Sequence, residues 1–460
     1  MKIAVLCGSP KGELSITLQY VRFIQKKFPQ HEFRIFHISE KIKEIEKNEK
    51  LFLDIIDEIR NSDGVLWAFP VYIFLVPSQY KRFIELIWEK KQQEVFNGKY
   101  TAVLTSSIHF YDHTAHNYMN AICDDLSMKY IGSFSADMYD LLIEKERKRL
   151  LLFFESSLEM INKKQPTSRR YGQLIPGNTD YVPSISSAKT DIGDKKIVLL
   201  TDSTDKDTNL VKMIWKFKDL IIGKVDTINL NDLDIKGGCL GCLHCTFDNT
   251  CIYEEKDEFT KFYNTKLKTA DMIIFAGSIK DRYLSAGWKL FFDRAFFNTH
   301  IPVLIGKQMG FIISGPFSQI QNLCEILEAQ IALYQSNLVD FVTDEYKNSS
   351  EIDALLQSFT RRLNDFSIKH YIKSSTFRNI AGMKIFRDYI WGRLRFLLQA
   401  DHRYYKRHGM YDFPQKNIRA RIFNEFVALI TKIPVVKKEF VKNIKENMVK
   451  PHKRMLKKIL

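Results

Sequence analysis

The segment "MKIAVLCGSPKGELSIT", residues 1–17, contains the pattern that decides the fold. A short apolar run, "KIAVL" (2–6), ends in a turn that contains glycine and proline, and a helical pattern follows from about Ser15 to Lys27. A fully apolar strand followed by a turn and a helix is typical of a parallel sheet whose two faces are both covered. We therefore predict that this strand lies inside such a sheet.

The same alternation continues through the first third of the chain. Helical segments separate four further strand-like runs, which are "EFRIFHI" (32–38), "GVLWAFP" (64–70), "YTAVLTSS" (100–107) and "KYIGSFSA" (129–136). Five apolar strands that alternate with helices indicate a doubly wound five-stranded parallel sheet. We predict that this α/β domain spans residues 1–161.

The pattern restarts after a polar segment. Residues 162–195 contain three prolines and no hydrophobic period, so we interpret them as a linker. Three later runs then repeat the first, third and fourth strands of the first domain, namely "KKIVLLTDST" (195–204), "ADMIIFAGS" (270–278) and "GKQMGFIISGP" (306–316). This repetition predicts a tandem duplication, with a second five-stranded domain over residues 196–370.

Composition and charge restrict the class of protein. Of the 460 residues, 45% are hydrophobic and 27% are charged, which is typical of globular proteins, and no apolar run approaches the roughly 18 residues needed to cross a bilayer. We expect a cytoplasmic protein. The net charge of +15 is uneven, because residues 371–460 carry 22 Lys and Arg against 6 Asp and Glu. The first 370 residues are nearly neutral, so we predict a separate basic helical region at the end.

The turn after the first strand has the residues of an anion-binding loop. In "GSPKGELSIT" (8–17), Ser9, Ser15 and Thr17 offer hydroxyl groups and Lys11 offers a cation, just before the start of a helix. A helix N-terminus attracts anions through its free backbone N–H groups. The loop matches neither the P-loop nor the Gly-x-Gly-x-x-Gly pattern, so it does not indicate a nucleoside triphosphate or a dinucleotide. Taken alone, such a loop is a poor signal for an anion site, and an ordinary helix cap is the better explanation.

A second segment extends this interpretation. "FPVYIFLVPSQYKRFIE" (69–85) follows the third strand, so Pro70 and Tyr72 lie at the carboxyl edge of the sheet, where open α/β folds bind ligands. Together, the two motifs resemble those of the flavodoxin-like NADPH-dependent FMN reductases. The resemblance covers residues 1–160. One departure is Ile16, where the family usually has asparagine between the serine and the threonine.

The resemblance implies a set of FMN-binding residues. Side chains of the first loop would hold the phosphate, namely Ser9, Lys11, Ser15 and Thr17. The ring would be lined by Pro70, Val71, Tyr72, Ile73 and Phe74, and its far side closed by Thr105, Ser106 and Ser107. The alternative for Tyr72 and Phe74 is that both are surface aromatic residues. For Lys81 we expect a solvent-exposed position on a helix, outside the site.

The second domain has a weaker version of this loop. In "TDSTDKDTNL" (201–210), the positions of hydroxyl and amide groups are kept by Ser203, Thr208 and Asn209. However, Asp202, Asp205 and Asp207 would repel a phosphate, because unpaired carboxylates in a dry anion site are costly. The segment "GSIKDRYLSAGWKLFFDRAFF" (277–297) lacks the proline of the ring-lining loop. We predict that this domain has lost or weakened its own FMN site.

Four of the seven cysteines lie close together in "GGCLGCLHCTFDNTCIYEEKD" (237–257). They are Cys239, Cys242, Cys245 and Cys251, spaced C-x2-C-x2-C-x5-C. A structural zinc usually takes two C-x2-C pairs separated by a long loop. Disulfides are disfavoured in a reducing compartment. An iron–sulfur cubane suits closely spaced triplets, although the ferredoxin run has three residues before its last cysteine and a proline after it.

The spacing resembles the compact motif of the iron–sulfur flavoproteins, which belong to the same flavodoxin-like superfamily. The resemblance implies that the four cysteines hold a [4Fe–4S] cluster close to FMN, and that the two domains form a covalent counterpart of the family's dimers. His244 is interpreted as an exposed spacer. The remaining cysteines, Cys7, Cys123 and Cys324, lie in or beside apolar segments and are expected to be buried thiols.

The basic region contains two amphipathic helical patterns, "NIAGMKIFRDYIWGRLRFLL" (379–398) and "QKNIRARIFNEFVALITKI" (415–433). Basic amphipathic helices bind anionic membrane surfaces or acidic proteins, and a membrane role would place the protein peripherally at the inner membrane face. A second interpretation is a helical cap over the two α/β domains. Nucleic acid is a third, for which no recognition motif is present.

These observations lead to one functional hypothesis and one competitor. The hypothesis is an FMN-dependent oxidoreductase that passes electrons from NAD(P)H or a ferredoxin through FMN and a [4Fe–4S] cluster to a small-molecule or protein acceptor. Further oligomerisation is compatible with it. The competitor is a redox-inactive scaffold with a structural four-cysteine zinc site and a basic docking tail.

Overall fold

The computed structural model describes residues 1–460 except 178, 186–187, 205–207 and 460. The prediction that Asp205 and Asp207 repel a phosphate therefore lies outside the described residues. The chain divides into two compact units, 1–402 and 403–460. Each unit is described by itself below.

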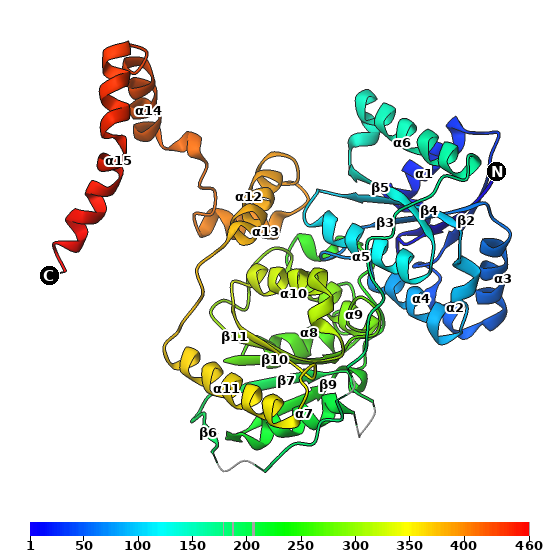
Figure 1. The fold of residues 1–460 in the computed structure, drawn as a ribbon, viewed down its shortest axis with the longest axis horizontal. Coiled ribbons are helices and arrows are strands. Elements are labelled where there is room, and N and C mark those ends of the chain that lie inside the picture. The colour runs from blue at the N-terminus through cyan, green and yellow to red at the C-terminus, as the bar shows by residue number, and fades with distance from the viewer. Residues whose placement is uncertain (178, 186–187, 205–207, 460) are drawn as a thin grey trace. The chain divides into compact units, whose positions relative to one another are not determined.

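The first sheet has five parallel strands in the order β2-β1-β3-β4-β5 (Figure 1). The strands are β1 (Lys2–Cys7), β2 (Glu32–His37), β3 (Gly64–Pro70), β4 (Tyr100–Ser107) and β5 (Lys129–Asp137). Six helices accompany them, namely α1 (Ile16–Lys27), α2 (Ile42–Lys47), α3 (Glu49–Arg60), α4 (Ser78–Glu89), α5 (Asp112–Asp125) and α6 (Glu144–Asn162). The strand order reverses at β1, which creates a crevice at the carboxyl ends of β1 and β3.

Both faces of this sheet are buried, as the apolar strands predict. Along β3, Trp67 and Phe69 enter a core formed with α2 to α5, whereas Leu66 and Ala68 enter a core formed with α1 and α6. This alternation follows from the period of two in a strand. Because the helices cover both faces, the polar groups that reach a ligand are confined to the loops at the sheet edge.

The second sheet repeats the topology of the first, with the order β9-β7-β10-β11-β12 and all strands parallel. Its strands are β7 (Ile197–Thr201), β9 (Val225–Asn229), β10 (Met272–Ser278), β11 (Gln308–Ser314) and β12 (Asn337–Thr343). The helices are α7 (Asn209–Asp219), α8 (Phe259–Phe262), α9 (Ala286–Ala295), α10 (Gln321–Leu333) and α11 (Ser349–Ile368). A small additional pair is formed by β6 (Thr190–Asp191) and β8 (Ile221–Ile222). The predicted fold class, two tandem five-stranded parallel sheets followed by a helical region, is confirmed.

The two α/β halves share one hydrophobic core. The cluster that contains Trp67 and Phe83 of the first half also contains Phe275 and Trp288 of the second, and α4 packs against α9. The outer faces are covered separately, by α1 and α6 in the first half and by α7 and α11 in the second. A common core of this kind explains why both sheets belong to one compact unit.

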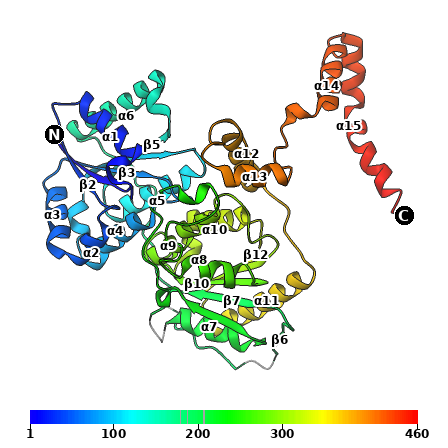
Figure 2. The same ribbon diagram turned by 180° about the vertical axis from the view of Figure 1, so that it is seen from behind.

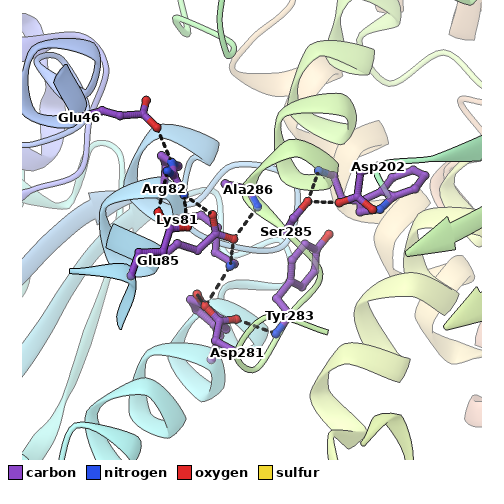
Figure 3. Close-up of polar contacts among 12 residues, drawn as sticks. Glu46, Lys81, Arg82, Glu85, Asp202, Asp281, Tyr283, Ser285 and Ala286 are labelled. Atoms are coloured by element: carbon purple, nitrogen blue, oxygen red, sulfur yellow. Dashed lines mark hydrogen bonds and ion pairs between the residues drawn. The ribbon is translucent and has the colours of Figure 1, made fainter. Parts of the chain in front are cut away.

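Buried ion pairs cross this interface in a nearly symmetric arrangement. Lys81 of α4 lies 2.7 Å from Glu85 and 2.9 Å from Asp281, and Glu85 accepts a 2.7 Å hydrogen bond from the backbone N–H of Ala286 at the start of α9 (Figure 3). The lysine is fully buried because the second half covers it. The prediction that Lys81 is solvent-exposed was therefore wrong, since it considered the first domain alone.

The matching contacts run in the opposite direction from α9. Lys289 pairs with Asp293 and donates a 2.8 Å hydrogen bond to the carbonyl oxygen of Tyr72. Asp293 accepts a 2.8 Å hydrogen bond from the backbone N–H of Ser78, at the start of α4. A carboxylate at a helix N-terminus satisfies free N–H groups and the helix dipole. Each helix thus caps the other, and Lys289 holds the loop that carries Tyr72.

The helices that follow the second sheet are α12 (Phe377–Gly392), α13 (Gln399–Arg407), α14 (Ile418–Ile430) and α15 (Pro434–Leu456) (Figure 2). Phe386 and Ile390 of α12 are buried within the first unit. Throughout the described residues, the helices are too short or too polar to cross a membrane.

Candidate functional site

A cavity of about 280 Å³ lies at the carboxyl ends of β1, β3 and β4. Of the twelve side chains predicted to bind FMN, eleven line this cavity, namely Ser9, Lys11, Ser15, Thr17, Pro70, Val71, Tyr72, Ile73, Phe74, Ser106 and Ser107. The exception is Thr105, which is buried, with its Oγ1 2.7 Å from His116 Nε2. The topology of the sheet therefore brings three separate sequence motifs to one place.

One end of the cavity is polar. Ser15 caps α1, since its Oγ accepts a hydrogen bond of 3.3 Å from the backbone N–H of Leu18. Thr17 and Ser106 share a hydrogen bond of 2.6 Å between their hydroxyl groups, and Ser9 is almost fully buried beside them. Several hydroxyl groups at the start of a helix form an environment that favours an anion.

The opposite wall is a tight turn. Tyr72 and Leu75 exchange two backbone hydrogen bonds of 2.9 Å and 3.1 Å across it, and Ile73 and Phe74 between them have φ angles of 37° and 66°. These left-handed conformations are costly for side chains other than glycine, most of all for β-branched isoleucine. The surroundings hold the turn, because Thr114 Oγ1 donates a 2.6 Å hydrogen bond to the Phe74 carbonyl.

The apolar end of the cavity comes from segments far along the chain. It is lined by Phe110 and Met138 and by side chains of the second half and of α12 and the turn after it, namely Phe296, Leu333, Phe386, Ile390, Leu394, Leu397 and Leu398. The ring centroid of Phe386 lies 4.2 Å from that of Phe110 and 3.9 Å from that of His300. The sequence analysis left open a helical cap formed by the basic region, which includes residues 379–398, but it assigned none of these side chains to the cavity.

Two polar contacts attach α12 to the end of β5. The Asp137 carboxylate accepts a hydrogen bond from the Tyr389 hydroxyl and forms an ion pair with Arg393 at 3.1 Å. The guanidinium of Arg393 also lies 4.6 Å from the centroid of the Tyr139 ring. These contacts hold α12 where Phe386 and Ile390 line the cavity.

The cysteine loop reaches the same cavity. Cys239, Gly241 and Leu243 line it together with the predicted FMN residues. Two side chains anchor the loop, because Gln79 donates a 3.0 Å hydrogen bond to the carbonyl of Cys239 and Arg294 donates one of 2.9 Å to that of Gly237. Gln79 belongs to the first half and Arg294 to the second, so the loop is held between them.

All four cysteines of the motif line a second, small cavity of about 30 Å³, together with Tyr253, Arg294 and Phe297. The backbone N–H of Gly241 donates a hydrogen bond of 3.4 Å to Cys239 Sγ. In the described part of the chain, no three His, Cys, Asp or Glu side chains are placed as ligands of a single ion. The thiols therefore surround a common space without forming a closed single-ion site.

Burial dominates the electrostatics of this region. It raises the pKa of Cys239 to about 12 and raises that of Cys245 as well, which favours the neutral thiol in both. Burial lowers the pKa of Lys11, and the neighbouring Cys239 and Cys242 oppose that shift. Burial also raises the pKa of Asp293, which the contact with Lys289 opposes. A metal centre at the cysteines would reverse this balance in favour of thiolates.

Described residues of the corresponding loop in the second half make hydrogen bonds within the chain. Asn209 accepts a 2.9 Å hydrogen bond from the backbone N–H of Tyr181, a fully buried linker residue, and donates one of 3.0 Å to Asp344. Asp344 also accepts a hydrogen bond of 2.6 Å from the Ser314 hydroxyl. Asp202 accepts a hydrogen bond from Ser285 (Figure 3). The loop that resembles the phosphate loop is thus engaged in contacts within the chain.

The other cysteines differ in burial. Cys7 and Cys123 are buried, and burial raises the pKa of Cys7 to about 12. Cys324 on α10 is only partly buried, which differs from the expectation of a buried thiol.

These features define an α/β protein whose first domain has a cavity at the switch point of a five-stranded parallel sheet, where open α/β folds bind ligands. Residues 1–139 match the model of the NADPH-dependent FMN reductase family, so this part of the chain is similar to the domain of that family. The match ends before the second sheet begins. A search of curated proteins found no match to the chain.

Several solved structures resemble the chain over one domain. FerB, a flavoenzyme NAD(P)H:(acceptor) oxidoreductase from Paracoccus denitrificans, has 22% identity and a TM-score of 0.28, covering 35% of this chain and 97% of its own. The apo form of the NADH:FMN oxidoreductase EMOB has 17% identity and a TM-score of 0.30, with coverages of 34% and 87%. An FMN-dependent NADH-azoreductase from Bacillus anthracis, in complex with FMN, has 12% identity and a TM-score of 0.26, with coverages of 36% and 99%.

Proposed function

We propose that this chain is an FMN-dependent NAD(P)H oxidoreductase that binds one FMN in its first domain and a [4Fe–4S] cluster at the four cysteines of the second. The observation that carries the proposal is the shared cavity. Residues of all three predicted flavin segments line it, and so does the loop that bears the cysteines. The family match of residues 1–139 supports NAD(P)H as the donor. A ferredoxin is the alternative donor.

The residues present fit FMN. Ser9, Ser15 and Thr17, with the start of α1, would hold the phosphate at the polar end of the cavity, and Lys11 would supply a positive charge. The strained turn from Tyr72 to Leu75 would lie against the ring. When bound, FMN supplies the chemistry that joins a two-electron hydride donor to a one-electron acceptor. The chain binds and orients the cofactor and excludes water through the apolar wall of α12.

The cysteine loop also has features that suit a cubane cluster. The four thiols surround one small cavity, and a backbone N–H already points at the sulfur of Cys239. A cubane is larger than a single ion, so its four cysteine sulfurs stand further apart than those around a zinc ion. Lys11 would offset part of the negative charge of four thiolates. Tyr72 and Gly241 would then separate the cluster from the flavin by a single side chain.

The second half is proposed to support the flavin site without binding a second FMN. Its own loop positions are engaged by Tyr181, Asp344 and Ser285. Its helix α9, in contrast, holds the Tyr72 loop of the first half through Lys289. This division would make the chain a covalent counterpart of an iron–sulfur flavoprotein dimer, in which each half has a different task.

The acceptor side is proposed to be apolar. The wall formed by Phe386, Ile390 and Leu394 offers no charged group to a ligand beside the ring. An uncharged small-molecule acceptor suits it, and a protein acceptor would instead take electrons at the exposed Cys242. A substitution of Phe386 distinguishes these two routes, because it should change electron transfer to a small-molecule acceptor and leave transfer to a protein acceptor unchanged.

Anaerobic purification followed by an absorption spectrum and by iron, zinc and flavin analysis tests the proposal. We expect one FMN, four iron atoms and no zinc per chain, since described residues of the second loop are engaged in hydrogen bonds within the chain and the cysteine spacing suits a cubane. A colourless protein that contains one zinc would contradict the proposal and would indicate a scaffold with a structural metal site.

A further inference from the structure

The last 45 residues, 416–460, combine positive charge with exposed apolar side chains. They carry 13 Lys and Arg against 3 Asp and Glu, a balance of +10. Helices α14 and α15 lie here, in the second compact unit. Both helices are described over their whole length, and none of their residues is buried.

The apolar residues of α14 follow the helical period. Ile422, Phe426 and Leu429 lie on successive turns, and Phe423 lies beside them. Ile422 and Phe423 are each 65% exposed, and Phe426 is 59% exposed. In a globular domain a stripe of this kind packs against a core. Here the stripe stays open along the whole helix.

Helix α15 repeats the arrangement with a longer basic face. Phe440, Ile444 and Met448 recur every fourth residue and are exposed. Lys438, Lys442 and Lys445 fall on the other side of the helix when it is viewed along its axis, because each residue advances the helix by about 100°. Apolar residues on one side and lysines on the other are the pattern of a helix that lies in a membrane interface.

We propose that residues 416–460 bind the surface of an anionic lipid bilayer. The exposed apolar stripes of α14 and α15 insert at the boundary between headgroups and acyl chains, and the lysines and arginines contact lipid phosphates. Neither helix is long and apolar enough to cross a membrane, which agrees with a position in the interface. The proposal does not depend on the flavin chemistry of the first unit.

Charge and apolar exposure together favour a bilayer over the other partners. A second copy of this segment would bring two surfaces of +10 together, and like charges repel. Nucleic acid or an acidic protein would use the lysines, but neither requires two apolar stripes with phenylalanine at their centres. An anionic bilayer satisfies both features at once.

Sedimentation of the full-length protein with lipid vesicles tests this proposal. We expect binding to vesicles of phosphatidylcholine mixed with phosphatidylglycerol, and about tenfold weaker binding to phosphatidylcholine alone, because each basic residue adds attraction to anionic lipid. Phe423→Glu combined with Phe426→Glu should weaken binding to mixed vesicles at least about tenfold, because it removes apolar insertion. A triple variant should weaken binding to mixed vesicles by a similar factor and leave binding to phosphatidylcholine vesicles unchanged. Its substitutions are Lys438→Gln, Lys442→Gln and Lys445→Gln.

A matched control is Leu142→Glu combined with Leu152→Glu, which introduces the same two negative charges at side chains that are 76% and 64% exposed in the first unit. It should leave vesicle binding unchanged. Circular dichroism and the flavin content of each variant verify that the protein is folded. The proposal is overturned by equal binding to both vesicle types, or by equal losses in the control. It is also overturned if the protein does not bind vesicles. In that case, self-association, duplex DNA binding or polyglutamate binding that the phenylalanine substitutions abolish would identify a second copy, nucleic acid or an acidic protein as the partner.

Discussion

A methyl group on Gly241 would lie 1.8 Å from the hydroxyl oxygen of Tyr72. Gly241 belongs to the cysteine loop of the second half, and Tyr72 belongs to the predicted flavin wall of the first. The Tyr72 hydroxyl is buried and has no hydrogen-bond partner among the described residues. Gly241 also has a φ of 62°, which a side chain tolerates poorly. Close packing and backbone conformation both require glycine where the two halves meet.

The first prediction concerns this contact. Gly241→Ala should reduce the affinity for FMN about tenfold or more, because the added methyl group must displace Tyr72 or the cysteine loop. Titration of the apoprotein with FMN, followed by flavin fluorescence, measures the change. Gly98→Ala is the matched control, since Gly98 has a φ of 72° and no described atom within 4 Å of an added methyl group. Equal losses in both variants would attribute the effect to backbone strain alone.

A second prediction separates the two loops that resemble each other. Ser9→Ala with Thr17→Ala should remove most bound FMN, because two hydroxyl groups disappear from the polar end of the cavity. Ser203→Ala with Thr208→Ala should retain the FMN content, at a cost of about 1 kcal/mol in stability from the lost cap of α7. Flavin released by denaturation is quantified for both variants. Similar losses, or two FMN per chain in the unmodified protein, would contradict the proposed specialisation.

The third prediction concerns the cysteines. Cys242→Ser should eliminate the iron content, since a serine hydroxyl is a poor ligand for iron in a cluster. Most FMN should remain, and its reduction by NAD(P)H should continue, whereas transfer to a one-electron acceptor should fail. Cys324→Ser is the control, because Cys324 lies on α10 outside the motif. Normal transfer to the acceptor in Cys242→Ser would show that the four cysteines only stabilise the loop.

Stability provides the fourth prediction. Lys81→Met leaves Glu85 and Asp281 without their shared cation in a buried interface, so the free energy of unfolding should fall by about 3–5 kcal/mol. Lys148→Met breaks a pair with Glu144 in which both side chains are 71% exposed, and it should cost less than about 1 kcal/mol. Denaturant unfolding at neutral pH compares the two variants. A small effect of Lys81→Met would mean that water enters the interface.

The local sequence pattern was sufficient to predict the strands of the first sheet and most of the residues at one side of the cavity. The apolar runs at 2–6, 64–70 and 100–107 became β1, β3 and β4, because strands buried on both faces leave a continuous hydrophobic signal. The residues that line the cavity were predicted from two short motifs and from the end of the fourth strand, because the carboxyl ends of these strands meet at the same sheet edge. Their role in binding FMN stays a prediction.

The sequence by itself thus determined the strands and helices, the second start of the strand–helix pattern, the cysteine spacing and the basic end of the chain, because these depend on neighbours in sequence. Only the tertiary structure decided that Lys81 is buried against Asp281, that Phe386 of α12 closes the cavity, and that Gly241 touches Tyr72. The physical reason is that each of these contacts joins residues separated by more than a hundred positions. Such pairs leave no periodic signal, and their burial is set by how the two halves share one core.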